Sequence, residues 1–177
     1  PSRVGLPIVD HEFLQSVFSA ARAVGALVIM DEVISFRLGI GGNQGRLGLE
    51  PDLTALAKII GGGFPVGATG GRADVMEVFA SIDGQRAAVP SGGTFSANPI
   101  TMVAGTACMA QLSDASFARL DEIGDSIRDG LRTVFAQQDR PWQVTGRGSL
   151  FRIHPHDRPI RSYRDAHLSD AEEAIMD

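Results

Sequence analysis

Apolar residues recur every three or four positions in two stretches of the chain, and this spacing predicts two amphipathic helices. The first stretch runs from Asp10 to Val24, where Asp10 can cap the start and Gly25 ends the pattern. The second begins after Asp114, and its apolar positions are Phe117, Leu120, Ile123, Ile127, Leu131, Val134 and Phe135. Its charged residues lie mostly off this stripe, so we expect a solvated face made of Arg119, Asp121, Glu122, Asp125, Arg128 and Asp129.

Continuous apolar runs alternate with helical stretches and predict buried strands. Residues 26–30 form such a run directly after the first helix, which is typical of a parallel strand buried on both faces. Residues 53–57 predict a second short strand and residues 66–71 a third, and a short helix is expected next, over residues 72–80. The order of these elements predicts an α/β fold with a central, mostly parallel sheet covered by helices.

Glycine-rich and polar segments separate these elements. Residues 36–51 contain five glycines without any period and predict a long loop, and residues 83–93 predict a second one. Asn98-Pro99 opens a helix that we expect to end near Leu112, because Asn is a good cap and Pro suits the first helical turn. Loops of this length in compact domains are often functional.

The pattern changes after Pro141 to two short strands, over residues 142–144 and 150–153, and then to a capping box from Ser169 to Glu172 that begins a helix. We therefore expect residues 1–140 to be the carboxyl-terminal portion of a large sheet domain, including a long connecting helix, and residues 141–177 to start a small α+β domain. Because the chain opens on Pro1 and stops soon after its last helix begins, we expect it to be part of a longer protein.

Composition narrows the function classes. The chain is 44% hydrophobic and 21% charged, as a globular protein is, and its net charge of −5 comes with single, scattered arginines, so we expect no nucleic-acid partner. No apolar run reaches the roughly 18 residues of a membrane span, so we expect no membrane partner. The single cysteine, Cys108, cannot form an intrachain disulfide, which indicates a reducing compartment and a cytoplasmic location.

Lys58 is the only lysine of the chain, while the other fifteen of its sixteen cationic residues are arginine. An amine can lose its proton near neutrality and condense with a carbonyl, whereas a guanidinium stays protonated. One interpretation is therefore that Lys58 takes part in covalent catalysis. The other is that Lys58 is an ordinary charged residue whose position has no chemical role.

Asp31 and Glu32 come directly after the first predicted strand, and Lys58 comes directly after the second. Ligands of open α/β sheets bind at the carboxyl ends of the strands, which makes these positions candidates for a site. The alternative is the start of a solvated loop, and we favour that alternative more for Glu32 than for Asp31.

Two other kinds of site are disfavoured. A phosphate loop of the Walker type places its lysine after the glycines, but Lys58 precedes Gly61-Gly62-Gly63. The only cluster of metal-binding residue types is His154-Pro155-His156-Asp157, which we interpret as a surface turn at a strand exit, so we expect no metal.

An acid and a lysine at the ends of two strands are the pair that pyridoxal phosphate requires. The lysine holds this cofactor as a Schiff base, and the acid keeps the pyridine nitrogen protonated. Asp31 and Lys58 are the candidates for these roles.

Four ordered motifs resemble those of the class III aminotransferases, which are pyridoxal-phosphate enzymes of fold type I. The motifs are LVIMDEV at 27–33, PDLT at 51–54 with KIIGGGFPVGA at 58–68, GGR at 70–72, and GTFSANP at 93–99. Within the family they are most like the glutamate-1-semialdehyde aminomutases, and they also look like transaminases that act on β-amino acids.

The resemblance implies a role for several residues. Lys58 would carry the cofactor and later move a proton, Asp31 would pair with the pyridine nitrogen, and Val33 would pack on the ring. Gly93 and Thr94 would bind the cofactor phosphate of the neighbouring subunit, so the resemblance implies a homodimer with shared sites. Judged by residue type alone, Val33 is a core residue and Thr94 a turn residue.

The resemblance leaves three functions open. The first is amino-group transfer, either as an aminomutase that forms 5-aminolevulinate for tetrapyrrole synthesis or as a transaminase of β-amino acids with a 2-oxo acid. The second is a non-enzymatic remnant that dimerises through residues 98–112, and the third a nucleotide-binding module. The family's amino-terminal half carries the main phosphate cradle, so the resemblance implies that catalysis needs more than these residues.

Overall fold

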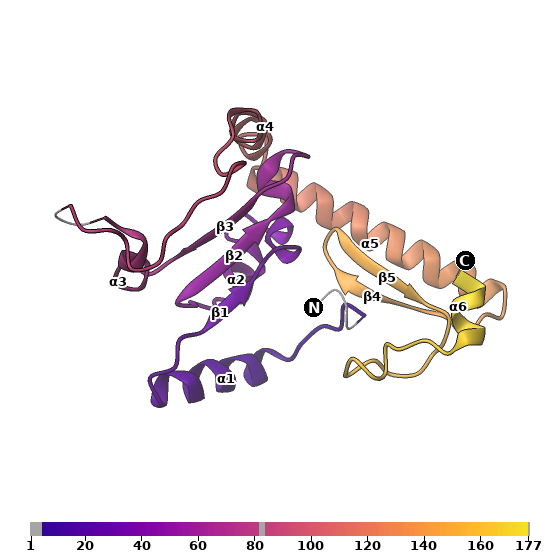
Figure 1. Ribbon diagram of the computed structural model, residues 1–177. Helices are drawn as coiled ribbons and strands as arrows, with labels where there is room; N and C mark the ends of the chain where they lie inside the picture. The colour runs from indigo at the N-terminus through magenta and orange to yellow at the C-terminus, as the bar shows by residue number, and fades with distance from the viewer. Residues whose placement is uncertain (1–4, 82–83, 177) are drawn as a thin grey trace. The chain divides into compact units, whose positions relative to one another are not determined.

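The structure is a computed structural model that describes residues 5–81 and 84–176. It divides into two compact units (Figure 1). The sheet unit comprises residues 11–114, and the hairpin unit comprises residues 115–176 together with residues 5–10. The long helix α5 (Asp114–Gln137) thus groups with the strands and helix of the carboxyl-terminal part of the chain. The division into domains at residues 1–140 and 141–177 stays a prediction.

The sheet unit is built on three strands, β1 (Ile29–Asp31), β2 (Leu53–Ala57) and β3 (Gly67–Gly71), in the order β1-β2-β3 (Figure 1). The first two are parallel, with Asp31 paired to Ala55, and β3 is antiparallel to β2. The α/β class predicted from the sequence is confirmed, although this sheet has one parallel and one antiparallel pair.

The helices of the sheet unit begin where the sequence signals lie. Helix α1 spans His11–Ala23, and α4 spans Pro99–Met109, where the Asn98 carbonyl Oδ1 accepts a hydrogen bond from Thr101 N at 3.0 Å. The short helix predicted over 72–80 is α3 (Ala73–Met76), and the 3₁₀ turn η4 (Glu77–Phe79) comes directly after it.

The glycine-rich segment 36–51 is more ordered than the predicted loop. It contains most of the 3₁₀ turn η2 (Ser35–Leu38) and the short helix α2 (Gly42–Arg46), and Leu38 and Leu49 are buried. Lack of a period did not reveal these elements because each is only about one turn long.

The burial predicted for β1 is wrong in the part of the chain that the structure describes. The side chains of Leu27 and Ile29 are 53% and 61% exposed. Side chains of a strand point to the two faces of the sheet, so this exposure means that the described residues leave the apolar run largely uncovered on those faces.

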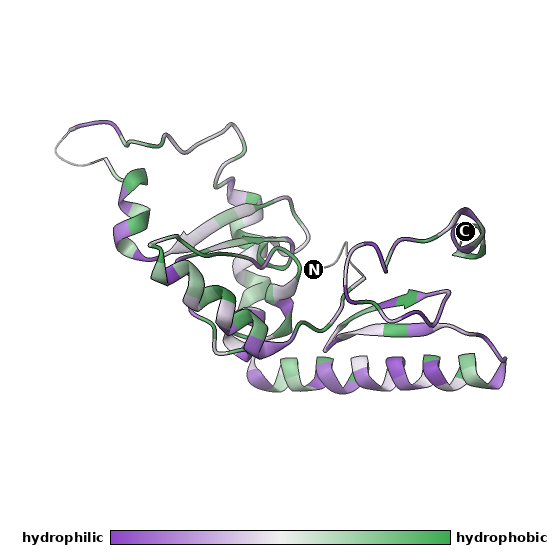
Figure 2. Ribbon diagram, turned by 90° about the horizontal axis from the view of Figure 1, so that it is seen from below, coloured by the Kyte–Doolittle hydropathy of each residue, from purple (hydrophilic) through white to green (hydrophobic). Residues whose placement is uncertain are grey.

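The hairpin unit packs α5 against the antiparallel strands β4 (Gln143–Arg147) and β5 (Leu150–His154). Figure 2 shows how hydrophobic and hydrophilic residues alternate around α5. Gly124 of α5 lies so close to the hairpin turn that a Cβ would meet Gly148 O at 1.9 Å. The capping box of α6 (Asp170–Met176) is confirmed, since Ser169 N donates to Glu172 at 2.8 Å.

Three charged or polar residues expected at the surface of the hairpin unit are buried instead. Arg128 of α5 is only 4% exposed because its guanidinium donates to Gly148 O at 2.5 Å and to the Asp125 carboxylate. His154 and His156 are 1% and 4% exposed, so the predicted surface turn is wrong for both histidines. Partners such as Gly148 for Arg128 and Gly5 for His154 come from distant parts of the sequence.

Candidate functional site

Asp31 and Lys58 lie at the same edge of the sheet. Asp31 is the last residue of β1, and Lys58 comes directly after the last residue of β2. The two strands are parallel neighbours, with Asp31 opposite Ala55, so Lys58 lies three residues further along the adjacent strand. The structure therefore places both residues that the sequence singles out at the carboxyl ends of adjacent strands, where α/β sheets bind ligands.

Lys58 has an unusual backbone. Its φ is +54°, in the left-handed region, where a non-glycine residue costs on the order of 1–3 kcal/mol and which is enriched at functional sites. The residue begins the 3₁₀ turn η3 (Lys58–Gly61), and the turn packs closely on α4: a Cβ on Gly62 would meet Ala104 O at 2.3 Å. This close packing of backbone on backbone holds the turn, and with it the lysine, in place.

The amine and the carboxylate are both exposed and are not paired with each other. The Lys58 side chain makes no hydrogen bond or ion pair within the described residues. Asp31 Oδ1 accepts one hydrogen bond, from Val33 N at 3.0 Å. Opposite charges at one edge that do not meet leave room for a ligand that binds both. An exposed carboxylate and an exposed amine are the two groups that would hold the ring nitrogen and the aldehyde of pyridoxal phosphate.

The other predicted site residues lie in two turns. Val33 is half-buried and its N–H donates to the Asp31 carboxylate, so Val33 belongs to the turn that helps to orient this carboxylate. Gly93 and Thr94 lie on an exposed turn in which Gly93 O accepts from Ser96 N at 2.9 Å. Within the described residues no hydrogen bond joins this turn to Asp31 or Lys58. The cofactor roles of Val33, Gly93 and Thr94 stay predictions.

Glu32 is the residue of this edge for which the sequence-based expectation is wrong. Instead of starting a solvated loop, its side chain is 0% exposed and accepts hydrogen bonds from Gln44 N at 2.6 Å and from the Ser35 hydroxyl. Its N–H donates to Ala55 O at 2.9 Å, which continues the strand pairing by one residue. Side chains alternate along a strand, so Asp31 and Glu32 point to opposite faces of the sheet. This alternation could have predicted from the sequence that one of the two acids is exposed and the other buried.

The GGRAD motif at 70–74 forms an ion-pair clamp at the opposite end of these strands. Arg72 donates to Asp52 at 2.7 Å and to Asp74 at 2.6 Å, and Asp52 also accepts from Val28 N at 2.7 Å. The Val28 N–H and the Arg72 guanidinium lower the pKa of Asp52. This clamp ties the starts of β1 and β2 to the end of β3, so we interpret the motif as structural support.

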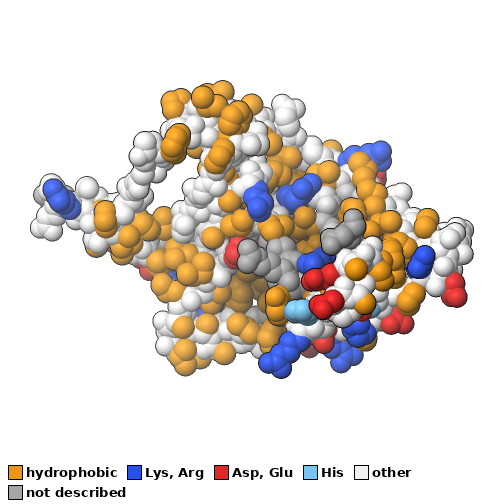
Figure 3. Space-filling view, turned by 45° about the vertical axis from the view of Figure 1, so that its right-hand side comes forward, with side chains coloured by type: hydrophobic (Ala, Val, Ile, Leu, Met, Phe, Trp, Pro, Cys, Tyr) orange, Lys and Arg blue, Asp and Glu red, His pale blue; other side chains and the backbone are white. Residues whose placement is uncertain are grey.

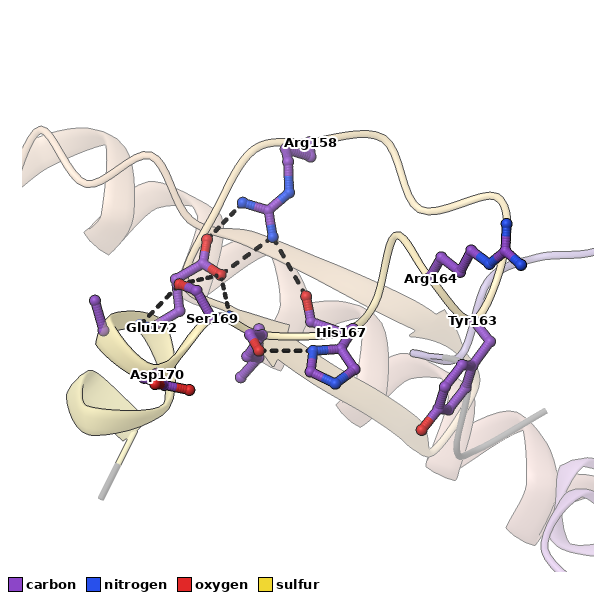
Figure 4. A pocket seen from close by; sticks show the side chains of 9 residues that line it. Arg158, Tyr163, Arg164, His167, Ser169, Asp170 and Glu172 are labelled. Atoms are coloured by element: carbon purple, nitrogen blue, oxygen red, sulfur yellow. Dashed lines mark hydrogen bonds and ion pairs between the residues drawn. The ribbon is translucent and has the colours of Figure 1, made fainter.

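A pocket of about 820 Å³ in the hairpin unit holds none of the predicted site residues (Figure 4). Glu172 accepts from Arg158 at 2.5 Å and from Ser169 N at 2.8 Å, and the Arg158 guanidinium is the main cause that lowers the pKa of Glu172 to about 2. Two charges of this pocket, Arg158 and Glu172, thus pair with each other. Among the described residues no group of three or more acidic, histidine or cysteine side chains could hold a metal. None of the described helices has the length and apolarity needed to cross a membrane.

Comparison with protein families gives a match over nearly the whole chain. The family described as aminotransferase class III matches residues 1–173. A glutamate-1-semialdehyde 2,1-aminomutase of Opitutus terrae is 41% identical over 170 residues, which are 95% of this chain and 39% of the relative. This chain spans about two fifths of the length of the curated relatives that it matches.

Solved structures give a similar picture. An omega-transaminase from Sphaerobacter thermophilus is 50% identical with a TM-score of 0.93, over 98% of this chain and 40% of that one. A beta-phenylalanine aminotransferase from Variovorax paradoxus is 36% identical with a TM-score of 0.83, again over 98% of this chain and 40% of that one.

Proposed function

We propose that this chain, which belongs to the class III aminotransferase family, supplies the lysine and the aspartate of a pyridoxal-phosphate site that transfers amino groups. The observation that carries the proposal is the position of Lys58 and Asp31 at the carboxyl ends of two adjacent parallel strands, where neither side chain forms an ion pair within the described residues. Further support comes from a solved structure described as a transaminase with PLP bound, which is 36% identical in sequence with a TM-score of 0.84, over 92% of this chain and 39% of that one.

The chain's own residues divide the chemistry between them. Pyridoxal phosphate supplies an aldehyde that condenses with amines and a ring that withdraws electrons from the substrate carbon. Lys58 would hold the cofactor through its amine and would move the proton at the substrate carbon. The Asp31 carboxylate would pair with the protonated ring nitrogen and so keep the ring electron-poor. Val33 would pack on one face of the ring.

A homodimer with shared sites is part of the proposal. Gly93 and Thr94 would bind the cofactor phosphate of the neighbouring subunit, in keeping with their exposed turn. Figure 3 shows hydrophobic side chains gathered over α4 at the top of the view, and Ile100 and Val103 there are 65% and 71% exposed. An apolar surface of this kind is typical of a protein interface.

The cytoplasmic location expected from the single cysteine belongs to the same proposal.

Two reactions compete within this function. The curated relatives described as aminomutases favour rearrangement of glutamate 1-semialdehyde. The 50% identity to an omega-transaminase and the 36% identity to a beta-phenylalanine aminotransferase favour transfer from an amine or β-amino acid to a 2-oxo acid. Because the 50% identity extends over 98% of the chain, we give the transaminase reaction precedence.

The first experiment tests the site. The full-length protein that contains this chain is prepared with pyridoxal phosphate, and its absorbance is recorded at about 400–430 nm, where a protonated imine of this cofactor absorbs. Lys58→Arg is the sharpest variant because it keeps the positive charge but cannot condense with an aldehyde. We expect the band in the unmodified protein and in Glu77→Gln, an exposed control, and its loss in Lys58→Arg. A band that survives Lys58→Arg contradicts the proposal.

The second experiment separates the reactions. The same protein is incubated with glutamate 1-semialdehyde alone and, separately, with a β-amino acid plus a 2-oxo acid. Formation of 5-aminolevulinate in the first mixture identifies an aminomutase, and formation of a new amino acid in the second identifies a transaminase. A protein that is dimeric but binds no cofactor would instead support the non-enzymatic alternative.

A further inference from the structure

The buried carboxylate next to Asp31 has a role that the proposed chemistry leaves unassigned. Glu32 is completely buried, yet it lies one residue beyond a carboxylate that is exposed at the candidate site. Burying a carboxylate is costly unless hydrogen-bond donors satisfy it. Its two oxygens are satisfied: Oε1 accepts from Gln44 N at 2.6 Å, and Oε2 accepts from the Ser35 hydroxyl.

The surrounding backbone is shaped to make these bonds. Gly42 has a φ of +70°, and a Cβ at this position would approach Glu32 Oε1 to 2.9 Å and the Phe36 ring to 3.0 Å. Phe36 N also donates to the Glu32 carbonyl at 3.0 Å, which closes the turn after Asp31. Helix α2 is therefore seated directly on the Glu32 carboxylate, and glycine is the residue that permits this approach.

Gln44 extends the contact to the neighbouring strand. Its backbone N–H binds Glu32, and its side-chain Oε1 accepts a hydrogen bond from Thr54 Oγ1 at 3.0 Å. Thr54 lies on β2, is only 9% exposed, and pairs with Met30 in the register of the two strands. Gln44 of α2 thus links Glu32, which follows Asp31 at the end of β1, to β2, the strand that Lys58 follows.

We infer that Glu32 is a positioning residue that holds the Asp31 carboxylate in a fixed place relative to Lys58, through Ser35, Gln44 and Thr54. The inference rests on the proposed function, because it assigns to Glu32 an effect on the cofactor that Asp31 and Lys58 would bind. Asp31 itself has only the Val33 N–H as a partner within the described residues, and Val33 belongs to the turn that Glu32 closes. Loss of the hydrogen bonds that Glu32 accepts should therefore make the turn after β1 more mobile, and with it the Asp31 carboxylate.

The test is a double-mutant cycle on the full-length protein, with spectroscopy of the cofactor as the readout. Glu32→Gln, Asp31→Asn and the double variant are titrated with pyridoxal phosphate, and the absorbance of each complex is recorded against pH. We expect Glu32→Gln to weaken cofactor binding by about tenfold, the scale seen for residues that orient a ligand-binding side chain, and to shift the pH at which the spectrum changes. Glu77→Gln, an exposed carboxylate in the same unit, serves as the matched control.

The cycle separates positioning from simple structural support. If Glu32 acts through Asp31, the double variant should bind the cofactor as weakly as Asp31→Asn and no more. Effects that multiply in the double variant, or a Glu32→Gln spectrum that titrates like the unmodified protein, overturn the inference. Thr54→Val keeps the Glu32 bonds and removes only the link to β2, so it should shift the spectrum in the same direction even if Glu32→Gln folds poorly.

The outcome is distinguishable from failure of the proposed function. An unmodified protein that shows no cofactor band removes the proposed function itself. An unmodified protein with the band, together with a Glu32→Gln and a Thr54→Val that behave identically to it, removes only the role of Glu32.

Discussion

The ends of β1 and β5 both carry polar residues in the sequence, but these residues differ in how they are buried and hydrogen-bonded. Each strand ends in polar residues that are compatible with a solvated exit: Asp31-Glu32 at the end of β1, and His154 with His156 at the end of β5. At β1 the first residue is exposed and the second is buried and satisfied by donors. At β5 both histidines are buried, and His156 Nε2 has no hydrogen-bond partner in the described residues.

The difference shows how a site is told apart from a polar core. Exposed Asp31 and Lys58 keep hydrogen-bonding capacity for a ligand, and buried Glu32 beside them has both oxygens satisfied. His154 has its bonds directed inward, to Gly5 O at 3.1 Å and Thr145 Oγ1 at 3.0 Å, so it ties the strand to the amino-terminal segment of its own unit. Unused hydrogen-bonding capacity at an exposed strand end is therefore the feature, beyond polarity, on which the proposed site rests.

The largest effect that tests this contrast is on Glu32. Replacing it by leucine leaves the N–H of half-buried Gln44 and the hydroxyl of half-buried Ser35 without their acceptor, which should cost about 2–5 kcal/mol of local stability. Hydrogen exchange of the amides in β1 and α2 measures that free energy directly. Glu77→Leu, at an exposed position, should change exchange there by less than about 0.5 kcal/mol. Equal protection in both variants would mean that the buried carboxylate is dispensable.

The second effect is a pH dependence of the hairpin unit. Burial lowers the pKa of both His154 and His156, and the positive charges of Arg152 and Arg158 add to this effect. The hydrogen bond to Gly5 opposes the pKa shift at His154, and Glu172 and Asp157 oppose the pKa shift at His156. The unfolded histidines have a pKa of about 6.5 and so bind protons at a higher pH than the folded ones. Stability from the neutral histidines is therefore complete above this pH and is lost as the pH falls below it.

Hydrogen exchange of β4 and β5 between pH 7.5 and about 5 checks this dependence, after correction for the intrinsic effect of pH on exchange. A His154→Gln/His156→Gln variant should show a flatter profile, since glutamine does not titrate. The sheet unit, where Glu32 is the fully buried ionisable group among the described residues, should lose less protection over the same range. Equal losses in both units would remove the contrast.

The smallest effect is expected at His156. Its Nε2 has no partner within the described residues and its Nδ1 lies 3.4 Å from Gln143 Nε2, so replacement by leucine removes little hydrogen bonding. The stability of the hairpin unit should change by no more than about 1 kcal/mol, against the larger loss for Glu32→Leu. Thermal unfolding of the two variants side by side gives this comparison. A loss of several kcal/mol at His156 would show that its buried ring is as tightly satisfied as the Glu32 carboxylate.

Local features were predictable from the sequence, and long-range burial was not. The periods of α1 and α5, the Asn98 cap and the Ser169-Glu172 box depend on neighbours within a few residues, and the structure confirms each of them. Lys58 stands out in the sequence because it is the only lysine and lies directly after a strand. The burial of Arg128 and His154 depends on Gly148 and Gly5, which are 20 and 149 residues away, and no local pattern reports such partners.

The central claim is that Lys58 binds the cofactor through its amine. Treating the cofactor-loaded full-length protein with borohydride makes the bond between lysine and cofactor permanent, and peptide mass spectrometry then locates it. Because this chain holds one lysine, a modified peptide from its residues identifies the site without ambiguity. The account predicts a pyridoxyl group on Lys58 and on no other lysine of the protein. A modified lysine outside this chain, with Lys58 unmodified, would contradict it.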